Sequence, residues 1–349
     1  MIAVPFLAAG IDLGGTKIEA QVFASDWHVQ SRRRVETPRT YTELVSVMAE
    51  TVAWIDSHAP NLPIGVSSAG LINPATGLAL TANLPATGHP FPADLQAATN
   101  RPIRFVNDCR ALTLSEAVFG AAKNLSPAIG LILGTGLGGG LVHDGRLFAG
   151  DNSMAAEVWQ FRHKLRPHTN AEEGASIRAV QRVYAEFAGR AIDPTLDPRA
   201  IFEIARGERT GNPYAALEAF RELGEVVGEV LGHALALVDG LVVIGGGMSA
   251  AWPLFADAMM IELNGSYTRP DGSRIRRLAS VAFDLEDPGQ LELFLAGDTH
   301  VMQIPGGSGT VSYDPLNRVG IGRSHLGTSE AVAVGAYAFA LARLDEGGA

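Results

Sequence analysis

The chain has 349 residues and a formal net charge of −10, with 47% hydrophobic and 18% charged positions. That length and apolar share are enough for two domains, each with its own core, while the acidic balance argues against general binding to nucleic acid or anionic membranes, because both are polyanions. The single cysteine, Cys109, excludes an intramolecular disulfide and a zinc cluster of several thiolates, and we expect it to be a small buried side chain.

The first residues, MIAVPFLAAGIDLGG, are apolar but lack the basic start and cleavage site of a secretory signal. The run is also too short to span a bilayer. We therefore expect a core strand entering a turn, and a cytoplasmic protein.

Strands and helices alternate along the first third of the chain. Apolar runs at 6–12 and 18–23 flank Leu-Gly-Gly-Thr and predict two strands joined by a tight turn that glycine permits. Apolar side chains at about 3.6-residue spacing predict a helix at 41–58, which Pro60 and Pro63 end. Further strands are expected at 62–67 and 101–106, and a helix at 112–123. This order is typical of an α/β fold.

The same pattern begins again after residue 127. A strand at 128–133 runs into Gly-Thr-Gly-Leu-Gly-Gly-Gly, and a return strand is expected at 141–143. A long helix at 213–240 leads into a strand at 241–244 and then Gly-Gly-Gly. An alanine-rich helix is expected at 328–344, whereas 298–323 is predicted to be irregular. Two strand–glycine turn–strand units predict duplicated halves that face each other across a cleft.

The first glycine turn, at residues 12–17, has the residue types of a phosphate site. Gly14 and Gly15 let the backbone approach phosphate oxygens and offer N–H groups with no Cβ in the way. Thr16 can add a hydroxyl donor, and Lys17 a positive charge. Asp12, at the strand end, can hold Mg²⁺ through water, because Mg²⁺ keeps much of its hydration shell. An ordinary β-hairpin is the alternative interpretation.

Two more glycine turns follow later strands. The turn after 128–133 lacks the Gly-Lys-Ser/Thr of a Walker sequence and opens no helix, so we expect it to cradle the β- and γ-phosphates between two strands. The turn after 241–244 would let a flat adenine or ribose lie on bare backbone, or it is only a close packing crossing. The nucleotide-binding residues predicted from these two turns are Gly134, Thr135, Gly136, Gly245, Gly246 and Gly247.

The three turns together resemble the phosphate and adenosine elements of the sugar kinase, Hsp70 and actin superfamily. The strings DLGGTK, VND and LGTGLGGG, in that order, resemble the ROK family specifically, from about residue 8 to 342. The resemblance implies a two-lobed, actin-like ATPase (ribonuclease H-like) fold, with a duplicated mixed sheet in each lobe and a cleft between the lobes. We expect a smaller lobe at 1–120 plus 329–349, closed by the C-terminal helix. The larger lobe, 121–328, would carry nucleotide-binding elements and an oligomer surface.

The resemblance also implies the residues that handle the acceptor. Asp108 takes the position of the ROK catalytic base, and a sugar hydroxyl needs such a carboxylate to accept its proton. Asn83, Asn107 and Asp108 itself would contact the sugar, and Gly70 lies in the preceding substrate loop. The alternative is that Asn107 and Asp108 only cap the following helix, since both residue types favour caps.

The segment 157–176 departs from the family pattern. Glu157 matches the carboxylate of the family's E-x-G-H string, but Gln160 stands where the family has a histidine that contacts both sugar and zinc. Gln160 can still donate and accept toward a sugar hydroxyl. Glu172 matches the last sugar-binding glutamate of this region, with Glu173 as a close competitor. The family's cysteine string is missing, so no structural zinc is expected.

Three residues with ring side chains lie within this altered string or shortly after it. His163 and His168 have no thiolates beside them, and we expect both at the surface. Trp159 replaces the family's glycine. It either stacks on a sugar face or fills the core that the metal leaves, and we expect the second.

The resemblance implies a sugar kinase that uses ATP and Mg²⁺ and acts as a homodimer or homotetramer. Its substrate would be the 6-hydroxyl of a hexose or N-acetylhexosamine, with glucose or N-acetylglucosamine as first choice. A catalytically weak, sugar-binding pseudokinase stays open because of the change at Gln160. A sugar-responsive regulator is a further alternative, although the DNA-binding domain of such proteins precedes the first glycine turn, and Asp12 lies near the N-terminus. The stretch 283–323 is longer than in the family, and we expect it either to cover the nucleotide or to shape the sugar entrance.

Overall fold

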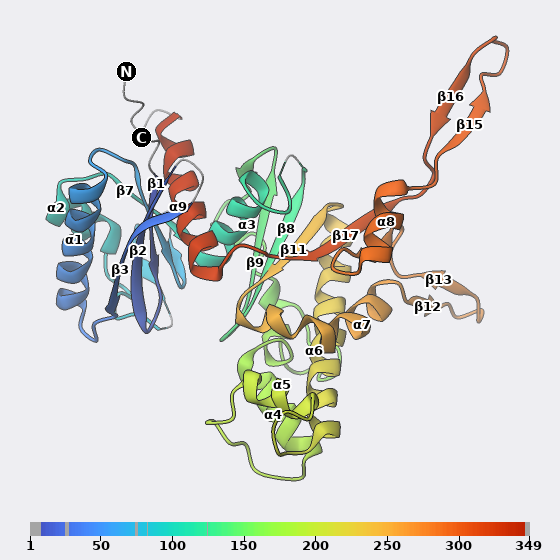
Figure 1. Cartoon of the computed structure of the whole chain (residues 1–349), viewed down its shortest axis with the longest axis horizontal. Coiled ribbons are helices and arrows are strands. Elements are labelled where there is room, and N and C mark those ends of the chain that lie inside the picture. The colour runs from blue at the N-terminus through green and yellow to red at the C-terminus, as the bar shows by residue number, and fades with distance from the viewer. Residues whose placement is uncertain (1–7, 25–27, 74–75, 82, 124, 346–349) are drawn as a thin grey trace. The chain divides into compact units, whose positions relative to one another are not determined.

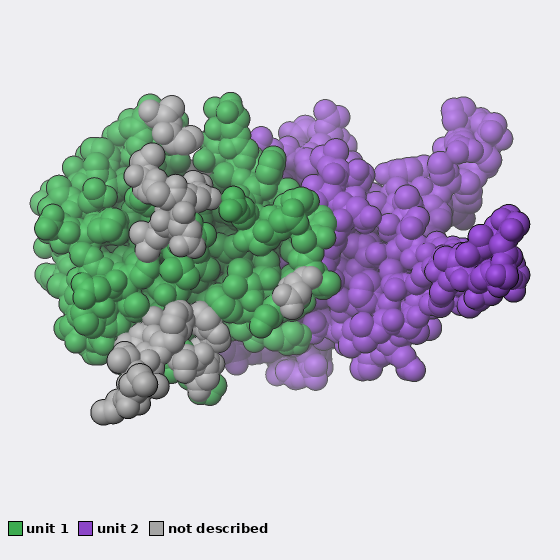
Figure 2. Space-filling model, turned by 90° about the horizontal axis from the view of Figure 1, so that it is seen from above, with its two compact units in different colours: residues 1–130, 140–156, 324–349 green, residues 131–139, 157–323 purple. Residues whose placement is uncertain are grey.

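The computed structural model describes residues 8–24, 28–73, 76–81, 83–123 and 125–345. The chain folds into two compact units, coloured separately in Figure 2. Unit 1 comprises residues 1–130, 140–156 and 324–349, and unit 2 comprises residues 131–139 and 157–323. The lobe boundaries expected at 120 and 328 stay a prediction.

The first sheet belongs to unit 1, and its strands are β1 (Ala8–Leu13), β2 (Lys17–Phe23), β3 (Val29–Glu36), β4 (Ile64–Ser68) and β7 (Ile103–Asn107). They lie in the order β3-β2-β1-β4-β7 (Figure 1). The β1–β2 and β2–β3 pairs are antiparallel, whereas β4 pairs parallel with β1 and β7 pairs parallel with β4. The four strands predicted in this region are thereby confirmed with shifted ends; residues 6 and 7 lie outside the described residues.

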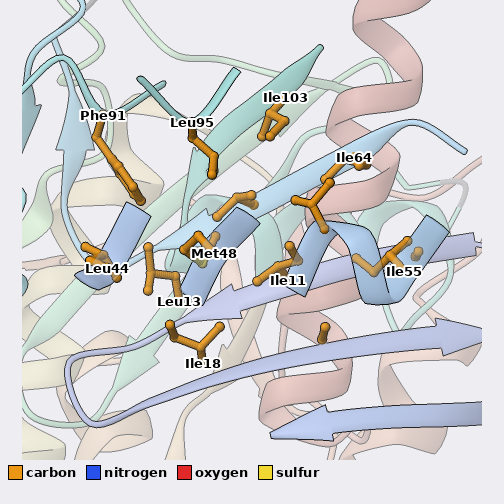
Figure 3. Close-up of a cluster of buried hydrophobic side chains, with 14 of the residues drawn as sticks. Ile11, Leu13, Ile18, Leu44, Met48, Ile55, Ile64, Phe91, Leu95 and Ile103 are labelled. Atoms are coloured by element: carbon orange, nitrogen blue, oxygen red, sulfur yellow. The ribbon is translucent and has the colours of Figure 1, made fainter. Parts of the chain in front are cut away.

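One face of this sheet is covered by α1 (Tyr41–His58) and α2 (Phe91–Thr99), and the helix predicted at 41–58 is confirmed with those bounds. Ile11 and Ile18 of the sheet lie in one buried cluster with Met48 of α1 and Leu95 of α2 (Figure 3). Each is completely shielded from solvent. This cluster fixes the register of β1 and β2, because a one-residue slip would turn the apolar side chains outward.

The C-terminal helix α9 (Thr328–Asp345) contacts β1, β4 and β7. A Cβ on Gly10 would lie 1.9 Å from the carbonyl oxygen of Ala333, and one on Gly65 would lie 1.8 Å from that of Ala336. Only glycine fits at such distances, so the alanine-rich helix lies directly on strand backbone. The helix predicted at 328–344 is confirmed, one residue longer.

The helix predicted at 112–123 is wrong at both ends. The observed helix is α3 (Asp108–Val118), and Asn107 caps it by accepting the backbone N–H groups of Cys109 at 3.0 Å and Arg110 at 3.4 Å. The cap starts the helix four residues earlier than its apolar periodicity indicates. Cys109 is buried, as expected.

The strands of the second sheet are β8 (Ala128–Leu133), β9 (Leu137–His143), β10 (Arg146–Leu147), β11 (Leu241–Gly245), β14 (Val281–Asp284) and β17 (Arg318–Arg323). Their order, β10-β9-β8-β11-β17-β14, repeats that of the first sheet: three consecutive strands in reverse, followed by later ones. This repeat confirms the predicted duplication of a mixed sheet. The return strand predicted at 141–143 begins earlier, at Leu137, because the glycines 138–140 are part of it.

The helices of unit 2 are α4 (Ile177–Phe187), α5 (Pro198–Ala205), α6 (Pro213–Leu237), α7 (Trp252–Leu263) and α8 (Pro288–Ala296). α6 and α7 pack backbone to backbone, since a Cβ on Gly224 would lie 2.1 Å from the carbonyl oxygen of Phe255. The predicted long helix is confirmed from residue 213 but ends at 237. Within the described residues, no helix is long and apolar enough to cross a membrane.

Short elements complete the chain: β5 (Leu71–Ile72), β6 (Ala79–Leu80), β12 (Ser266–Thr268), β13 (Arg274–Arg276), β15 (His300–Gln303), β16 (Thr310–Tyr313) and the 3₁₀ turns Val158–Gln160, Ala171–Glu173 and Gly247–Ala251. The prediction that 298–323 is irregular is wrong. β15 and β16 form an antiparallel hairpin there, and β17 joins the second sheet in parallel with β11 and β14.

Candidate active site

Two carboxylates meet at one edge of the first sheet. Asp12 lies opposite Ser67 in the β1–β4 pair, and Ser68 lies opposite Asn107 in the β4–β7 pair. Asp108 follows as the first residue of α3. Asp12 and Asp108 therefore both lie at the carboxyl ends of parallel strands, with only β4 between those strands. Such an edge is where α/β proteins bind their ligands.

The surroundings of Asp12 disfavour its charged carboxylate. Burial and, less strongly, the negative charge of Asp108 raise its pKa to about 6, against the opposing effect of Lys17. The ammonium of Lys17 donates to Ser329 at 2.7 Å and to Glu19 at 2.9 Å. A divalent cation would relieve this crowding of negative charge, so hard carboxylate oxygens here fit Mg²⁺, which takes one or two carboxylates plus substrate phosphates.

The β1–β2 turn is a tight, supported loop. The N–H of Gly14 donates to the carbonyl of Lys17 at 2.9 Å, and the hydroxyl of Thr37 donates to the carbonyl of Gly14 at 2.7 Å. A Cβ on Gly15 would lie 2.8 Å from that of Asn83, so the predicted sugar ligand lies directly against the predicted phosphate turn. Thr16 is exposed at the tip.

Asn107 has two structural roles at the start of α3. Besides capping the helix, its amide donates to the carbonyl of Gly70 at 3.2 Å, which ties the predicted substrate loop to β7. Gly70, Asn107 and Arg110 border a pocket of about 100 Å³ within unit 1. Ligand pockets usually measure roughly 300–1,000 Å³, so this pocket can take only part of a ligand.

The glycine turn between β8 and β9 is held by Glu172. Its Oε2 accepts the N–H of Leu137 at 3.0 Å, and a Cβ on Gly136 would lie 2.3 Å from that oxygen. Arg178 pairs with Glu172 at 2.6 Å and with Glu173 at 2.7 Å. Glu172 thus supports the predicted phosphate turn, and its role as a sugar ligand stays a prediction, as does that of its competitor Glu173. Thr135 is exposed, and a Cβ on Gly134 would meet no atom within 4 Å.

Two neighbouring glycines of the third turn differ in their surroundings. Gly246 has φ +88°, and a Cβ there would lie 2.3 Å from the carbonyl oxygen of Leu133, so it is a close packing crossing. Gly247 is open, with no atom within 4 Å of an added Cβ. It borders a pocket of about 460 Å³ within unit 2, together with Phe202 of α5 and Met248. That volume lies in the usual range for small-molecule sites.

Trp159 is not a core-filling residue, contrary to the prediction. Its side chain is only partly buried, and its indole N–H donates to Oε2 of Glu157 at 2.7 Å. Both residues belong to the turn around Val158–Gln160, whose backbone places them side by side. The predicted sugar-binding carboxylate is therefore oriented by an aromatic donor. Gln160 is exposed.

His163 is not at the surface, contrary to the prediction. Its side chain is 0% exposed, and its Nδ1 accepts the N–H groups of Leu165 at 3.1 Å and Arg166 at 3.2 Å. Burial, with the nearby positive charges of Arg166 and Arg182, lowers its pKa to about 4, so it is neutral at physiological pH. His168 is exposed, as expected. In the described part of the chain, no group of three or more His, Cys, Asp or Glu could hold a metal ion.

The structure thus brings the predicted residues together in two sets. Asp12, Gly15, Lys17, Asn83 and Asp108 gather within unit 1, whereas the later glycine turns and their glutamates lie within unit 2. Sequence reasoning missed the residues that support them, among them Thr37, Arg178, Phe202 and Ser329. Ser329 is 312 positions from the lysine it contacts, and no local pattern signals such a partner.

Comparison with known proteins gives consistent results. The model of the ROK family matches residues 8–270. The chain is 30% identical over 266 residues to an N-acetylgalactosamine kinase of Shewanella sp. (strain ANA-3), covering 71% of this chain and 83% of that protein. It is 32% identical over 265 residues to an N-acetyl-D-glucosamine kinase of Yersinia pseudotuberculosis, with 69% and 83% covered.

A solved structure extends the similarity over nearly the whole chain. The glucokinase from Parabacteroides distasonis superposes with a TM-score of 0.82 at 32% identity, covering 98% of this chain and 99% of that one. With the repeated strand order, this similarity confirms the actin-like ATPase fold. The chain belongs to the ROK family.

Proposed function

We propose that this chain transfers the γ-phosphoryl group of ATP to the 6-hydroxyl of a hexose or an N-acetylhexosamine. It is a sugar kinase, with glucose or N-acetylglucosamine as the preferred acceptor. The observation that carries the proposal is the placement of both Asp108 and Asp12 at the carboxyl edge of β1, β4 and β7, beside the turn that holds Lys17. Relatives named as N-acetylglucosamine kinase and glucokinase support the class of acceptor.

Asp108 is the general base in this proposal. A sugar hydroxyl is a weak nucleophile, and its oxygen attacks the γ-phosphorus effectively only as a carboxylate accepts its proton. The oxygen–phosphorus bond forms, the bond to the β-phosphate oxygen breaks, ADP leaves, and the proton stays on Asp108. The cap formed by Asn107 fixes the first turn of α3 and with it the backbone from which the base extends.

The remaining residues would neutralise and orient the phosphates. Asp12 would hold Mg²⁺ through water, and Mg²⁺ supplies positive charge to the β- and γ-phosphates. Lys17, Thr16 and the glycine N–H groups at 14–15 and 134–136 would donate to phosphate oxygens. The pocket beside Gly247 would take the adenosine part, with Gly245 and Gly246 shaping the backbone there. Because ATP is the donor, we place the protein in the cytoplasm.

Sugar recognition is assigned to Asn83, Asn107, Glu157, Gln160 and Glu172. Within this set, Glu157 would accept two sugar hydroxyls, and Trp159 is its positioning residue, because the indole N–H holds one carboxylate oxygen. A hydrogen bond to a charged group contributes about 1.5–3 kcal/mol, enough to select one carboxylate orientation.

The position of phosphorylation tests the reaction directly. The purified chain is incubated with Mg²⁺, ATP and glucose or N-acetylglucosamine, and the product is examined by phosphorus and proton NMR. The proposal predicts a phosphate coupled to the two protons on C6. A phosphate on another carbon would contradict the assigned acceptor hydroxyl, and sugar binding without any product would favour a catalytically weak, sugar-binding protein.

A further inference from the structure

A two-stranded ribbon projects from α8 in unit 2. We call it the arm and define it as residues 299–313, which include β15 and β16 (Figure 1). Every residue of both strands is exposed. A lone two-stranded hairpin is at best marginally stable in water, because it has no core of its own. The arm therefore has the form of an element that is completed by a partner.

The two faces of the arm differ in chemistry. The register pairs His300 with Tyr313 and Met302 with Val311, and these four residues share one face because side chains alternate along a strand. The rings of His300 and Tyr313 stack with centroids 5.7 Å apart. Met302, Val311 and Tyr313 are 47%, 45% and 45% exposed. An apolar and aromatic face is thus left uncovered.

The opposite face is mostly polar. There, Gln303 pairs with Thr310 and Val301 pairs with Ser312. It offers a partner one apolar side chain among three polar ones. The contrast between the faces singles out the first face for docking.

The arm also lacks the charges that normally protect an exposed ribbon. Residues 299–313 contain no Asp, Glu, Lys or Arg, although the whole chain has a net charge of −10. Natural edge strands usually carry charged side chains that prevent pairing with other chains. Their absence here means that two equally charged copies of this protein can meet at the arm without facing like charges.

The adjoining helix is exposed as well. α8 has no buried residue, and its Leu293 and Leu295 are 61% and 70% exposed. Together, α8 and the arm span residues 288–313. One side of a standard protein interface contains roughly 20–30 residues, so one face of this segment supplies part of such a side.

From these observations we propose that the apolar face of the arm, with α8, docks on the same surface of a second copy of this chain. The contact would be isologous, with each subunit giving and receiving the same surface, as in a two-fold dimer. Within the long stretch 283–323, this assigns α8 and the arm to subunit contact, whereas β17 belongs to the second sheet. The surface is independent of the residues assigned to phosphoryl transfer, all of which lie outside 283–323.

The test compares charge placed on the two faces of the arm. Met302→Asp with Val311→Asp adds two carboxylates to the apolar face, and Gln303→Asp with Thr310→Asp adds the same two to the opposite face, one residue away on each strand. The full chain and both double variants are measured by sedimentation velocity over a series of protein concentrations up to about 100 µM, with circular dichroism to check folding. We expect a dimer for the wild type and the Gln303/Thr310 variant, and a dimer affinity lowered by about 100-fold or more for the Met302/Val311 variant, because an unpaired carboxylate is costly to bury.

Three results would overturn the proposal. The first is a wild-type chain that stays monomeric at the highest concentration of the series. The second is a Met302/Val311 variant that associates as strongly as the wild type. The third is equal weakening by both double variants, since the contact would then not depend on the apolar face.

Discussion

The turn between β1 and β2 and the segment 157–178 both carry predicted ligand-binding residues, but different interactions stabilise them. The first matches its family's string residue by residue. It is supported by a backbone hydrogen bond within the turn and by the hydroxyl of Thr37, which donates to the carbonyl of Gly14. The second has lost the family's cysteines and one histidine. It is held by a buried neutral histidine, by an indole that orients Glu157, and by Arg178, which pairs with two glutamates.

This difference separates reacting groups from supporting groups. Few other side chains can replace a carboxylate that acts on the phosphate or on the attacking hydroxyl. Asp12 and Asp108 are accordingly present at the strand ends. A loop that presents a sugar ligand can be stabilised by metal, by ion pairs or by packing. The altered segment therefore gives no reason to deny the chain catalytic activity, provided Asp12 and Asp108 act as proposed.

The largest expected effect comes from removing the base in the family-like region. Asp108→Asn keeps the shape of the side chain but cannot accept the proton, so kcat should fall by about 10²–10⁴. Sugar affinity, measured by titration calorimetry, should change little because the amide still offers an oxygen. Near-normal turnover by this variant would remove Asp108 from the mechanism.

Asp12→Asn should lose catalytic activity and gain stability. The pKa of about 6 lies above the ordinary 3.8, so the charged carboxylate opposes folding at neutral pH. The variant should lose Mg²⁺-dependent turnover, yet its free energy of unfolding at about pH 7.5 should rise by on the order of 1–3 kcal/mol.

The pH dependence of that gain checks its cause. The advantage of the Asp12 variant over the wild type should shrink as the pH falls from about 6 toward 3.8, where the wild-type carboxyl becomes protonated in both states. Urea unfolding at several pH values measures it. A variant less stable than the wild type at neutral pH would show that Asp12 contributes favourable contacts that outweigh its burial.

Of the two regions, the segment 157–178 should contribute more to the loss of stability in acid than the β1–β2 turn, because it contains His163. Its pKa is about 4 in the folded chain and 6.5 ordinarily, so the unfolded state binds the proton first as the pH falls. Stability should decrease from about pH 6.5 downward, by roughly 2 kcal/mol at pH 5. His163→Asn cannot take up that proton and should show a flatter pH profile of unfolding, although it is less stable at neutral pH.

His168→Asn is the matched control, because His168 is exposed in the same loop. It should leave the pH profile unchanged. An equal change of slope in both histidine variants would refute the assignment to the buried ring.

The smallest effect is expected at the indole of Trp159. Trp159→Phe keeps an aromatic ring but removes the N–H that holds Glu157 at 2.7 Å. The KM for the sugar should rise by about 10-fold with little change in kcat, since the bond positions a binding group and not a reacting one. Trp54→Phe, on α1, serves as control. A fall in kcat at unchanged KM would contradict the positioning role.

Sequence reasoning reached the strands and the glycine turns because both carry local signals. Alternating apolar runs and a glycine pair specify the β1–β2 hairpin, and the 3.6-residue spacing at 41–58 specifies α1. The start of α3 is predicted four residues late because its apolar periodicity begins after the cap, although the cap considered for Asn107 is confirmed. The arm was missed because its exposed strands lack the burial contrast that marks a strand in a sequence.

The supporting residues of the candidate site depended on tertiary contacts. Whether His163 is buried is decided by the packing of Gly174 and α6 around it, and a histidine in a polar loop gives no sign of that. The hydrogen bond from Trp159 to Glu157 requires the backbone of a 3₁₀ turn. The positions of these two residues in the sequence, two apart, do not predict that turn.

The rate of ADP release by the full chain tests the central claim most directly. It is measured in a coupled assay with Mg²⁺ and ATP, without sugar and with each of glucose, N-acetylglucosamine, N-acetylmannosamine, mannose and fructose. We predict that at least one sugar raises the rate well above the sugar-free rate, and that Asp108→Asn abolishes the increase. No stimulation by any of these sugars, with intact binding of ATP and sugar, would contradict the account.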